Sequence, residues 1–233
     1  MKSLKRTQFS YKKTNITILS DIDAGFAREE LIRNYGLLER YIRKNPLFLS
    51  SYEPLPSDDE APAIIRNMLS ASQKTEVGPM ASVAGAFSDL LGRFLLEKGA
   101  SDVIVENGGD IFLIITEPRT VGIHAGPSRL SDRLAFKVKP DETPMGICTS
   151  SNSVGPSISL GRSDASTVAA DSSALADAAA SAIGNAVNGD NYMNKVITIA
   201  KGLKGVRGVL VIKGEEIGAW GRLPSLIKTS NTK

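Results

Sequence analysis

The chain has 233 residues, of which 42% are hydrophobic and 23% are charged, as is typical of a globular protein. Its net charge of +3 is too small to indicate nucleic-acid binding. A single cysteine excludes an internal disulfide framework and a cysteine zinc cluster. The polar, basic N-terminus and the absence of a long uncharged apolar run indicate neither a signal peptide nor a membrane span. We therefore expect a cytoplasmic protein with one domain, 1–233, and flexible tails at 1–6 and 228–233.

The first third of the chain predicts a hairpin followed by helices. Asp23 is a candidate N-cap for the first helix, and Pro46 lies beyond its end. Ser57 and Glu60 have the spacing of a capping box before the second helix. From alternation and helical periodicity, the expected elements are strands at 8–12 and 15–19, helices at 23–43 and from about 60, and a long apolar helix ending near Lys98.

After this helix the hydrophobic pattern changes from helical to alternating. The mixture predicts an α/β (α+β) fold with antiparallel strand pairs. A Gly/Ser-rich segment over 146–164 interrupts the strands. The elements expected here are strands at 103–106, 111–115, 121–124, 134–138 and 167–170, helices at 171–187 and 192–201, and a closing hairpin at 208–213 and 216–220.

Two glycine-containing segments are candidates for phosphate binding. In residues 78–86 a proline and several small residues begin a helix, whose first amides would attract a phosphate. Tight packing of that helix on a sheet would explain the same small residues. In residues 106–110, Asn107, Gly108, Gly109 and Asp110 predict either a tight hairpin turn or a group of backbone N–H donors for a phosphate.

Two further segments carry oxygen or sulfur atoms. In residues 146–157 several hydroxyls surround Cys148, which has no cationic neighbour to activate it and is typical of a small buried hydrophobe. In residues 176–181, Asp177 and Ser181 are four positions apart on one helix face. A carboxylate and a hydroxyl on one face suit Mg²⁺, and the alanines around them indicate a helix packed on all sides.

Taken in order, the four segments resemble the ApbE-like flavin transferase superfamily, most closely its short cytoplasmic branch from anaerobic archaea and bacteria. The resemblance covers residues 75–190 and implies an ApbE-like (T-fold-like) fold of mixed, mainly antiparallel sheets with packed helices. The chain departs from the family pattern in three places. Ala84-Gly85 replaces Lys-Gly, a His…Pro-Arg-Thr-Gly block has no counterpart, and Pro156 stands where a histidine is expected, which leaves His124 as the one histidine.

This resemblance implies FAD and Mg²⁺ as cofactors, with possible transfer of FMN to a hydroxyl of a target protein. It makes Asp177 the metal carboxylate, Ser181 the hydroxyl ligand, and a carbonyl from residues 80–84 the third protein ligand. The residues that it places at the cofactor are Gly78, Met80, Ala81, Gly85, Asn107, Gly108, Gly109, Asp110, Thr149, Ser150 and Ser151.

Two other functions stay open at this point. The chain could handle sulfur in anaerobic sulfur assimilation, with Cys148 as a catalytic residue that carries a persulfide or activates sulfide. It could also be a structural homologue without chemistry. The expected partner is a small-molecule nucleotide or a sulfur species, with neither nucleic acid nor membrane, and the chain could form a homodimer.

Overall fold

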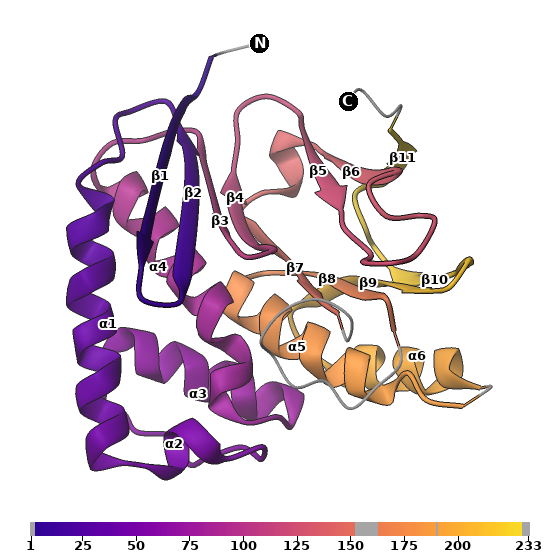
Figure 1. Cartoon of the computed structure of the whole chain (residues 1–233), viewed down its shortest axis with the longest axis horizontal. Coiled ribbons are helices and arrows are strands. Elements are labelled where there is room, and N and C mark those ends of the chain that lie inside the picture. Colours follow the sequence, from indigo (N-terminus) through magenta and orange to yellow (C-terminus); the bar gives the residue numbers. More distant parts are fainter. Residues whose placement is uncertain (1–2, 152–162, 190, 230–233) are drawn as a thin grey trace.

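The computed structural model describes residues 3–151, 163–189 and 191–229, which form three layers. Figure 1 shows α5 and α6 on one side of a large sheet and a small sheet on its other side. The large sheet is antiparallel throughout, in the order β1-β2-β3-β4-β7-β8-β9-β10. Its strands are β1 (Lys5–Tyr11), β2 (Thr14–Ser20), β3 (Val103–Asn107), β4 (Asp110–Ile114), β7 (Met145–Ser150), β8 (Ala165–Ala170), β9 (Val206–Lys213) and β10 (Glu216–Gly221).

The small sheet and the helices complete the described structure. The small sheet has the order β11-β6-β5 and is also antiparallel. Its strands are β5 (Arg119–Ile123), β6 (Leu134–Val138) and β11 (Ser225–Lys228). The helices are α1 (Ala27–Lys44), α2 (Leu47–Ser50), α3 (Ala63–Thr75), α4 (Val83–Glu97), α5 (Ser173–Ala186) and α6 (Tyr192–Gly202), with short 3₁₀ turns η1 (Pro79–Ser82) and η2 (Pro140–Glu142). In the described ranges, no helix is long and apolar enough to span a bilayer.

Alternation along the central strands divides their side chains between two cores. On β9, Leu210 and Ile212 pack toward the small sheet, whereas Val209 and Val211 pack toward α5 and α6. Successive side chains of a strand point to opposite faces. Cys148 on β7 lies in the helix-side core, so residues in phase with it face α5.

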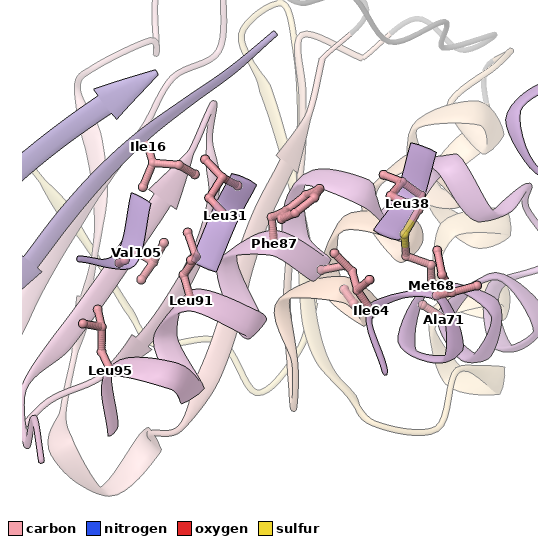
Figure 2. Close-up of a cluster of buried hydrophobic side chains, with 14 of the residues drawn as sticks. Ile16, Leu31, Leu38, Ile64, Met68, Ala71, Phe87, Leu91, Leu95 and Val105 are labelled. Atoms are coloured by element: carbon pink, nitrogen blue, oxygen red, sulfur yellow. The ribbon is translucent and has the colours of Figure 1, made fainter. Parts of the chain in front are cut away.

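A third core lies between the N-terminal helices and the first strands. Figure 2 shows Ile16 and Val105 of the sheet facing Leu91 and Leu95 of α4. Burying a large aliphatic side chain contributes about 1.5–3 kcal/mol, so this contact fixes α4 firmly on β2 and β3. The N-terminus of α4 is thereby held beside α5, where the candidate site lies.

The predicted α/β mixture with mainly antiparallel sheets is confirmed, and the differences are local. Asp23 does not cap a helix, because α1 begins at Ala27 and the Asp23 carboxylate accepts a hydrogen bond from Gly25 N within a turn (2.9 Å). The capping box at Ser57 and Glu60 does not form either, because Pro62 precedes α3 as its N-cap.

Strand pairing explains the remaining differences. β1 begins at Lys5 and β11 ends at Lys228, so strands extend into both segments expected to be tails. β7 lies in the Gly/Ser-rich segment expected to be irregular, where it pairs with β4 and β8. A strand between two others gains hydrogen bonds on both edges, which local composition does not reveal.

Candidate functional site

The candidate site lies where the N-terminus of α4 contacts α5, and small residues make that contact close. A methyl group on Gly85 of α4 would overlap the carbonyl of Ser173 on α5. A methyl group on Gly146 of β7 would overlap the same turn of α5 from the sheet side. The alanine-rich face of α5 is buried between them. The small residues of segments 78–86 and 176–181 thus permit tight packing, as one of the two interpretations predicted.

Asp177 connects the two helices directly. Its Oδ2 accepts a hydrogen bond from the backbone N–H of Gly85 at 2.9 Å, and its carboxylate also accepts one from Ala84 N–H. Both amides belong to the first turn of α4, where N–H groups lack partners within the helix. The hydroxyl of Ser82, at the N-cap position, instead donates to Pro79 O (2.9 Å). Asp177 therefore caps α4 from the neighbouring helix.

Asp89 makes the reverse connection. It lies on α4 and is 2% exposed, and its two carboxylate oxygens accept hydrogen bonds from Ser173 N–H (2.8 Å) and Ala174 N–H (2.9 Å). These amides begin α5. Each helix thus supplies a carboxylate to the N-terminus of the other, an arrangement we call the reciprocal caps. Sequence reasoning missed Asp89, although a charged residue inside the apolar pattern of residues 83–97 was a signal.

The sheet supplies polar groups beneath this junction. Asn107 Nδ2 donates a hydrogen bond to the carbonyl oxygen of Ala84 (3.2 Å). This bond fixes the orientation of that carbonyl in the same helical turn whose amides bind Asp177. Asp110 begins β4 and lies opposite both Asn107 and Cys148 in the ladder. Ser88 Oγ of α4 donates to Asp110 O (2.8 Å). The second and fourth predicted segments therefore meet at the start of α4.

Burial dominates the electrostatics of the acidic groups. It raises the pKa of Asp177 to about 7 against the opposing effect of the Gly85 and Ala84 amides, and the charge of Asp89 raises it further. Burial and then the Asp177 charge raise the pKa of Asp110 well above its ordinary value. Asp177 and Ser181 keep part of their surface accessible. Carboxylates crowded in this way would gain from a nearby cation.

Cys148 is sealed below this junction. It is 0% exposed, and its Sγ donates to Ser173 O (3.3 Å). Burial, followed by the negative charge of Asp110, raises its pKa well above the ordinary value. A sulfur nucleophile needs the thiolate at neutral pH, and this environment favours the protonated thiol. Cys148 thus matches the prediction of a small buried hydrophobe.

Gly108 and Gly109 form the tight turn between β3 and β4. Their φ angles are +64° and +99°, and Asn107 pairs directly with Asp110 across the turn. Positive φ at both central residues is the requirement of a type I′ hairpin, which glycine meets at no steric cost. No heavy atom beyond the adjacent residues lies within 4 Å of a methyl group built on either glycine. The hairpin prediction is confirmed, and the turn leaves open space above it.

The chain is similar in sequence to a described family and to archaeal proteins. Residues 1–200 match the family described as AbpE bacteria. A UPF0280 protein of Methanococcus maripaludis strain C7 is 43% identical over 228 residues, which cover 95% of this chain and 92% of that protein. A UPF0280 protein of Methanocaldococcus jannaschii is 42% identical over 226 residues, covering 94% and 91% respectively. The chain belongs to the AbpE bacteria family.

Solved structures resemble this AbpE bacteria member in fold. A variant of the flavin transferase ApbE from Vibrio cholerae superposes with a TM-score of 0.59 at 14% identity, covering 93% of this chain and 97% of that one. The apo flavinyl transferase ApbE from Pseudomonas stutzeri gives 0.59 at 13% identity, with 94% of each chain covered. These likenesses confirm the predicted ApbE-like fold.

Several residues predicted for the cofactor have structural contacts elsewhere in this AbpE bacteria member. Gly78 lies where a methyl group would overlap the carbonyl of Ser51, so it permits the chain after α2 to cross. Met80 and Ala81 pack against the core between the N-terminal helices and the first strands. These contacts place all three beside the junction without pointing to a ligand.

The hydroxyl-rich segment divides between the two faces of the sheet. Thr149 is out of phase with Cys148, and its Oγ1 lies 2.9 Å from that of its cross-strand partner Thr167. Ser150 is in phase with Cys148, so it faces α5, and Ser151 is buried just beyond the strand. Thr149 is therefore not brought to the α4–α5 junction. Residues 152–157, with Pro156, lie outside the described residues.

His124 lies away from the junction. It follows β5 in the small sheet, on the opposite side of the large sheet from α5. Its Nδ1 lies 3.3 Å from Asp132 and 3.2 Å from Ser131 Oγ, and its side chain is 59% exposed. It has no contact with Asp177 or Ser181, and its position gives it no part in the site.

The donors at the junction are oxygens of several types. In the described part of the chain, no three or more His, Cys, Asp or Glu side chains are grouped to hold a metal ion. The available set is one carboxylate (Asp177), one hydroxyl a helical turn away (Ser181), and the carbonyl of Ala84. Mg²⁺ prefers a few protein oxygens and completes its coordination with water and phosphate, whereas zinc and softer metals prefer nitrogen and sulfur ligands. The donor set fits Mg²⁺.

Proposed function

We propose that the α4–α5 junction binds the phosphates of a flavin-type nucleotide, FAD, together with Mg²⁺. The observation that carries the proposal is the position of Asp177. Its carboxylate lies at the first amides of α4, and the Ala84 carbonyl is part of the same turn. A metal held there by Asp177, Ser181 and Ala84 O would supply charge neutralisation to a pyrophosphate.

The surroundings support a phosphate ligand in two further ways. The N-terminus of α4 carries a partial positive charge that favours anions. The Gly108-Gly109 turn adjoins the junction through Asn107 and leaves open space for a large group. Asn107 would act by holding the Ala84 carbonyl in place. A bound cation would favour the ionised form of Asp110, whose pKa burial raises.

Transfer of FMN is the reaction that this site would serve. The two ApbE structures with which the chain shares its fold are named flavin or flavinyl transferases. In such a transfer the bond between the two phosphates of FAD breaks, an acceptor hydroxyl becomes bonded to FMN, and AMP leaves with the electron pair of the broken bond. The residues of this chain would bind and orient the pyrophosphate, and the hydroxyl proton would pass to a base that the described residues do not identify.

Calorimetric titration of FAD with and without Mg²⁺ tests the binding step. Asp177→Asn keeps one acceptor for Gly85 N–H but removes the charge, so we expect Mg²⁺-dependent binding to disappear while circular dichroism stays that of the folded chain. Glu106→Gln is the control, since Glu106 is an exposed carboxylate on the neighbouring strand β3. Unchanged binding in Asp177→Asn would remove Asp177 from the site.

AMP release separates a transferase from a binding protein. If FAD binds with Mg²⁺ but no AMP appears with hydroxyl-bearing acceptor peptides, the proposal is reduced to nucleotide binding, as expected of a homologue without chemistry. The sulfur function has no observation in its favour, because Cys148 is buried with a raised pKa.

A further inference from the structure

A second polar region lies along the α4–α5 contact, beside the first turn of α5. A cavity of about 230 Å³ opens where α3, α4 and the first turn of α5 meet. Polar residues of all three helices line it: Asn67, Ser70, Lys74, Asp89, Arg93 and Ser172. We propose that this cavity binds a small anion through a phosphate or carboxylate group, independently of the flavin site.

Two cations without a hydrogen-bonded partner give the cavity its charge. Neither Lys74 nor Arg93 forms a hydrogen bond or an ion pair within the described part of the chain. Arg93 is attracted to Asp89 only through space, because both oxygens of Asp89 accept backbone N–H groups of α5. The lining thus carries two positive side chains against one carboxylate whose acceptors are already in use. A bound anion would accept hydrogen bonds from both cations.

The positive charge comes from side chains and not from the helix N-terminus. The first amides of α5 already donate to Asp89 and, at Leu175, to Ser172 Oγ (3.2 Å). A ligand would therefore contact the guanidinium and ammonium groups, with Asn67 and Ser70 as neutral hydrogen-bond partners from α3. A guanidinium presents two parallel donors to a carboxylate or phosphate, and an ammonium adds a point charge.

The volume of the cavity limits the size of the anion that it can hold. A volume of about 230 Å³ corresponds to several waters at about 30 Å³ each and lies below the usual range of roughly 300–1,000 Å³ for drug-sized ligands. It admits inorganic phosphate, pyrophosphate or a small polycarboxylate such as citrate, and it is too small to enclose a dinucleotide. The ligand class is therefore different from that proposed for the α4–α5 junction.

Calorimetric titration with phosphate, pyrophosphate and citrate, in separate arms without divalent cations, tests this proposal. We expect saturable binding of one anion per chain in at least one arm, and the arm that binds most tightly distinguishes phosphate from carboxylate recognition. The double variant Lys74→Ala/Arg93→Ala should bind about tenfold more weakly for each cation removed. Both side chains are exposed on helices, where alanine is well tolerated.

Arg28→Ala/Lys201→Ala is the matched control, because it removes the same charges from exposed positions on α1 and α6. It should bind as the unmodified chain does. Equal weakening in both double variants, unchanged binding in Lys74→Ala/Arg93→Ala, or no saturable binding in any arm would overturn the proposal. If the double variant is poorly folded, Lys74→Ala alone serves, since Lys74 lies on α3 and takes no part in the hydrogen bonds of the Asp89 cap. Asp177→Asn should retain anion binding, so failure of the flavin proposal is distinguishable from failure of this one.

Discussion

Asp89 offers the sharpest test of how the site is built. Its carboxylate accepts the N–H groups of Ser173 and Ala174, both at buried residues. Asp89→Ala would leave these two N–H donors without acceptors, so α5 would lose the cap that α4 supplies. Asp89→Asn would keep one acceptor oxygen and turn an NH₂ group toward the second amide. The two variants therefore remove the hydrogen bonds in part and in full, and both substituted residues are compatible with the helical backbone of α4.

The magnitude follows from the two hydrogen bonds. A buried donor left unsatisfied costs about 1–3 kcal/mol, and loss of a helix N-cap typically costs about 1 kcal/mol. Part of this cost is recovered, because burial already raises the pKa of Asp89 and so opposes its charged form. Water from the adjoining cavity can also reach the first turn of α5. We expect a loss of about 2–4 kcal/mol for Asp89→Ala and about half as much for Asp89→Asn.

Thermal and urea unfolding measure these losses. For a chain of this length, 1 kcal/mol shifts Tm by about 2–4 °C, so Asp89→Ala should lower Tm by roughly 5–15 °C. Glu97→Ala is the control, since Glu97 is an exposed carboxylate at the end of the same helix, and its effect should stay within about 0.5 kcal/mol. A loss below about 1 kcal/mol in Asp89→Ala would refute the reciprocal caps as a source of stability.

Three other outcomes follow from the same geometry. The pKa of Asp177 is raised to about 7 in the folded chain. Between about pH 4 and pH 7 the folded chain therefore binds more protons than the unfolded chain, and the free energy of unfolding should fall as pH rises. Asp177→Asn should flatten this pH dependence in unfolding scans. Gly85→Ala should destabilise the chain by about 1–3 kcal/mol through overlap with Ser173 O. Gly108→Ala should cost about 1–2 kcal/mol from its positive φ alone. A loss below about 1 kcal/mol for Gly85→Ala in urea unfolding would contradict the close packing of α4 on α5. Cys148 should resist iodoacetamide at pH 7–8 in the folded chain and react once urea unfolds it; rapid alkylation of the folded chain would revive the sulfur function.

Local patterns were enough to predict most elements of the fold. The segments 134–138 and 192–201 coincide closely with β6 and α6, because each has a clear hydrophobic period. The ends of helices were predicted less well. Asp23 and Ser57 have the residue types of N-caps, yet α1 and α3 begin several residues later. Polar residues before a helix can close a local turn instead, and Asp23 does so with Gly25.

For the candidate site, the sequence predicted local arrangements of residues but not the contacts between distant segments. Spacing alone placed Asp177 and Ser181 on one face of a helix, and the Asn-Gly-Gly-Asp sequence predicted the hairpin. Asp89 carries no local motif, because its partners at the start of α5 lie 84 and 85 residues further along the chain. Contacts of that separation depend on tertiary packing, which periodicity does not encode. The cavity with Lys74 and Arg93 was missed for the same reason, since its residues come from three helices.

The observed role of Asp177 as a cap of α4 is compatible with the role that we propose for it as a ligand for Mg²⁺. A carboxylate has about four lone-pair directions, and the N–H groups of Gly85 and Ala84 use two of them. Those hydrogen bonds stabilise the charged form while burial opposes it. A divalent cation on the remaining lone pairs would remove the conflict and lower the pKa. The cap would therefore hold the carboxylate in position for the proposed metal. The raised pKa of Asp177 reflects a buried carboxylate whose charge the two amides only partly neutralise.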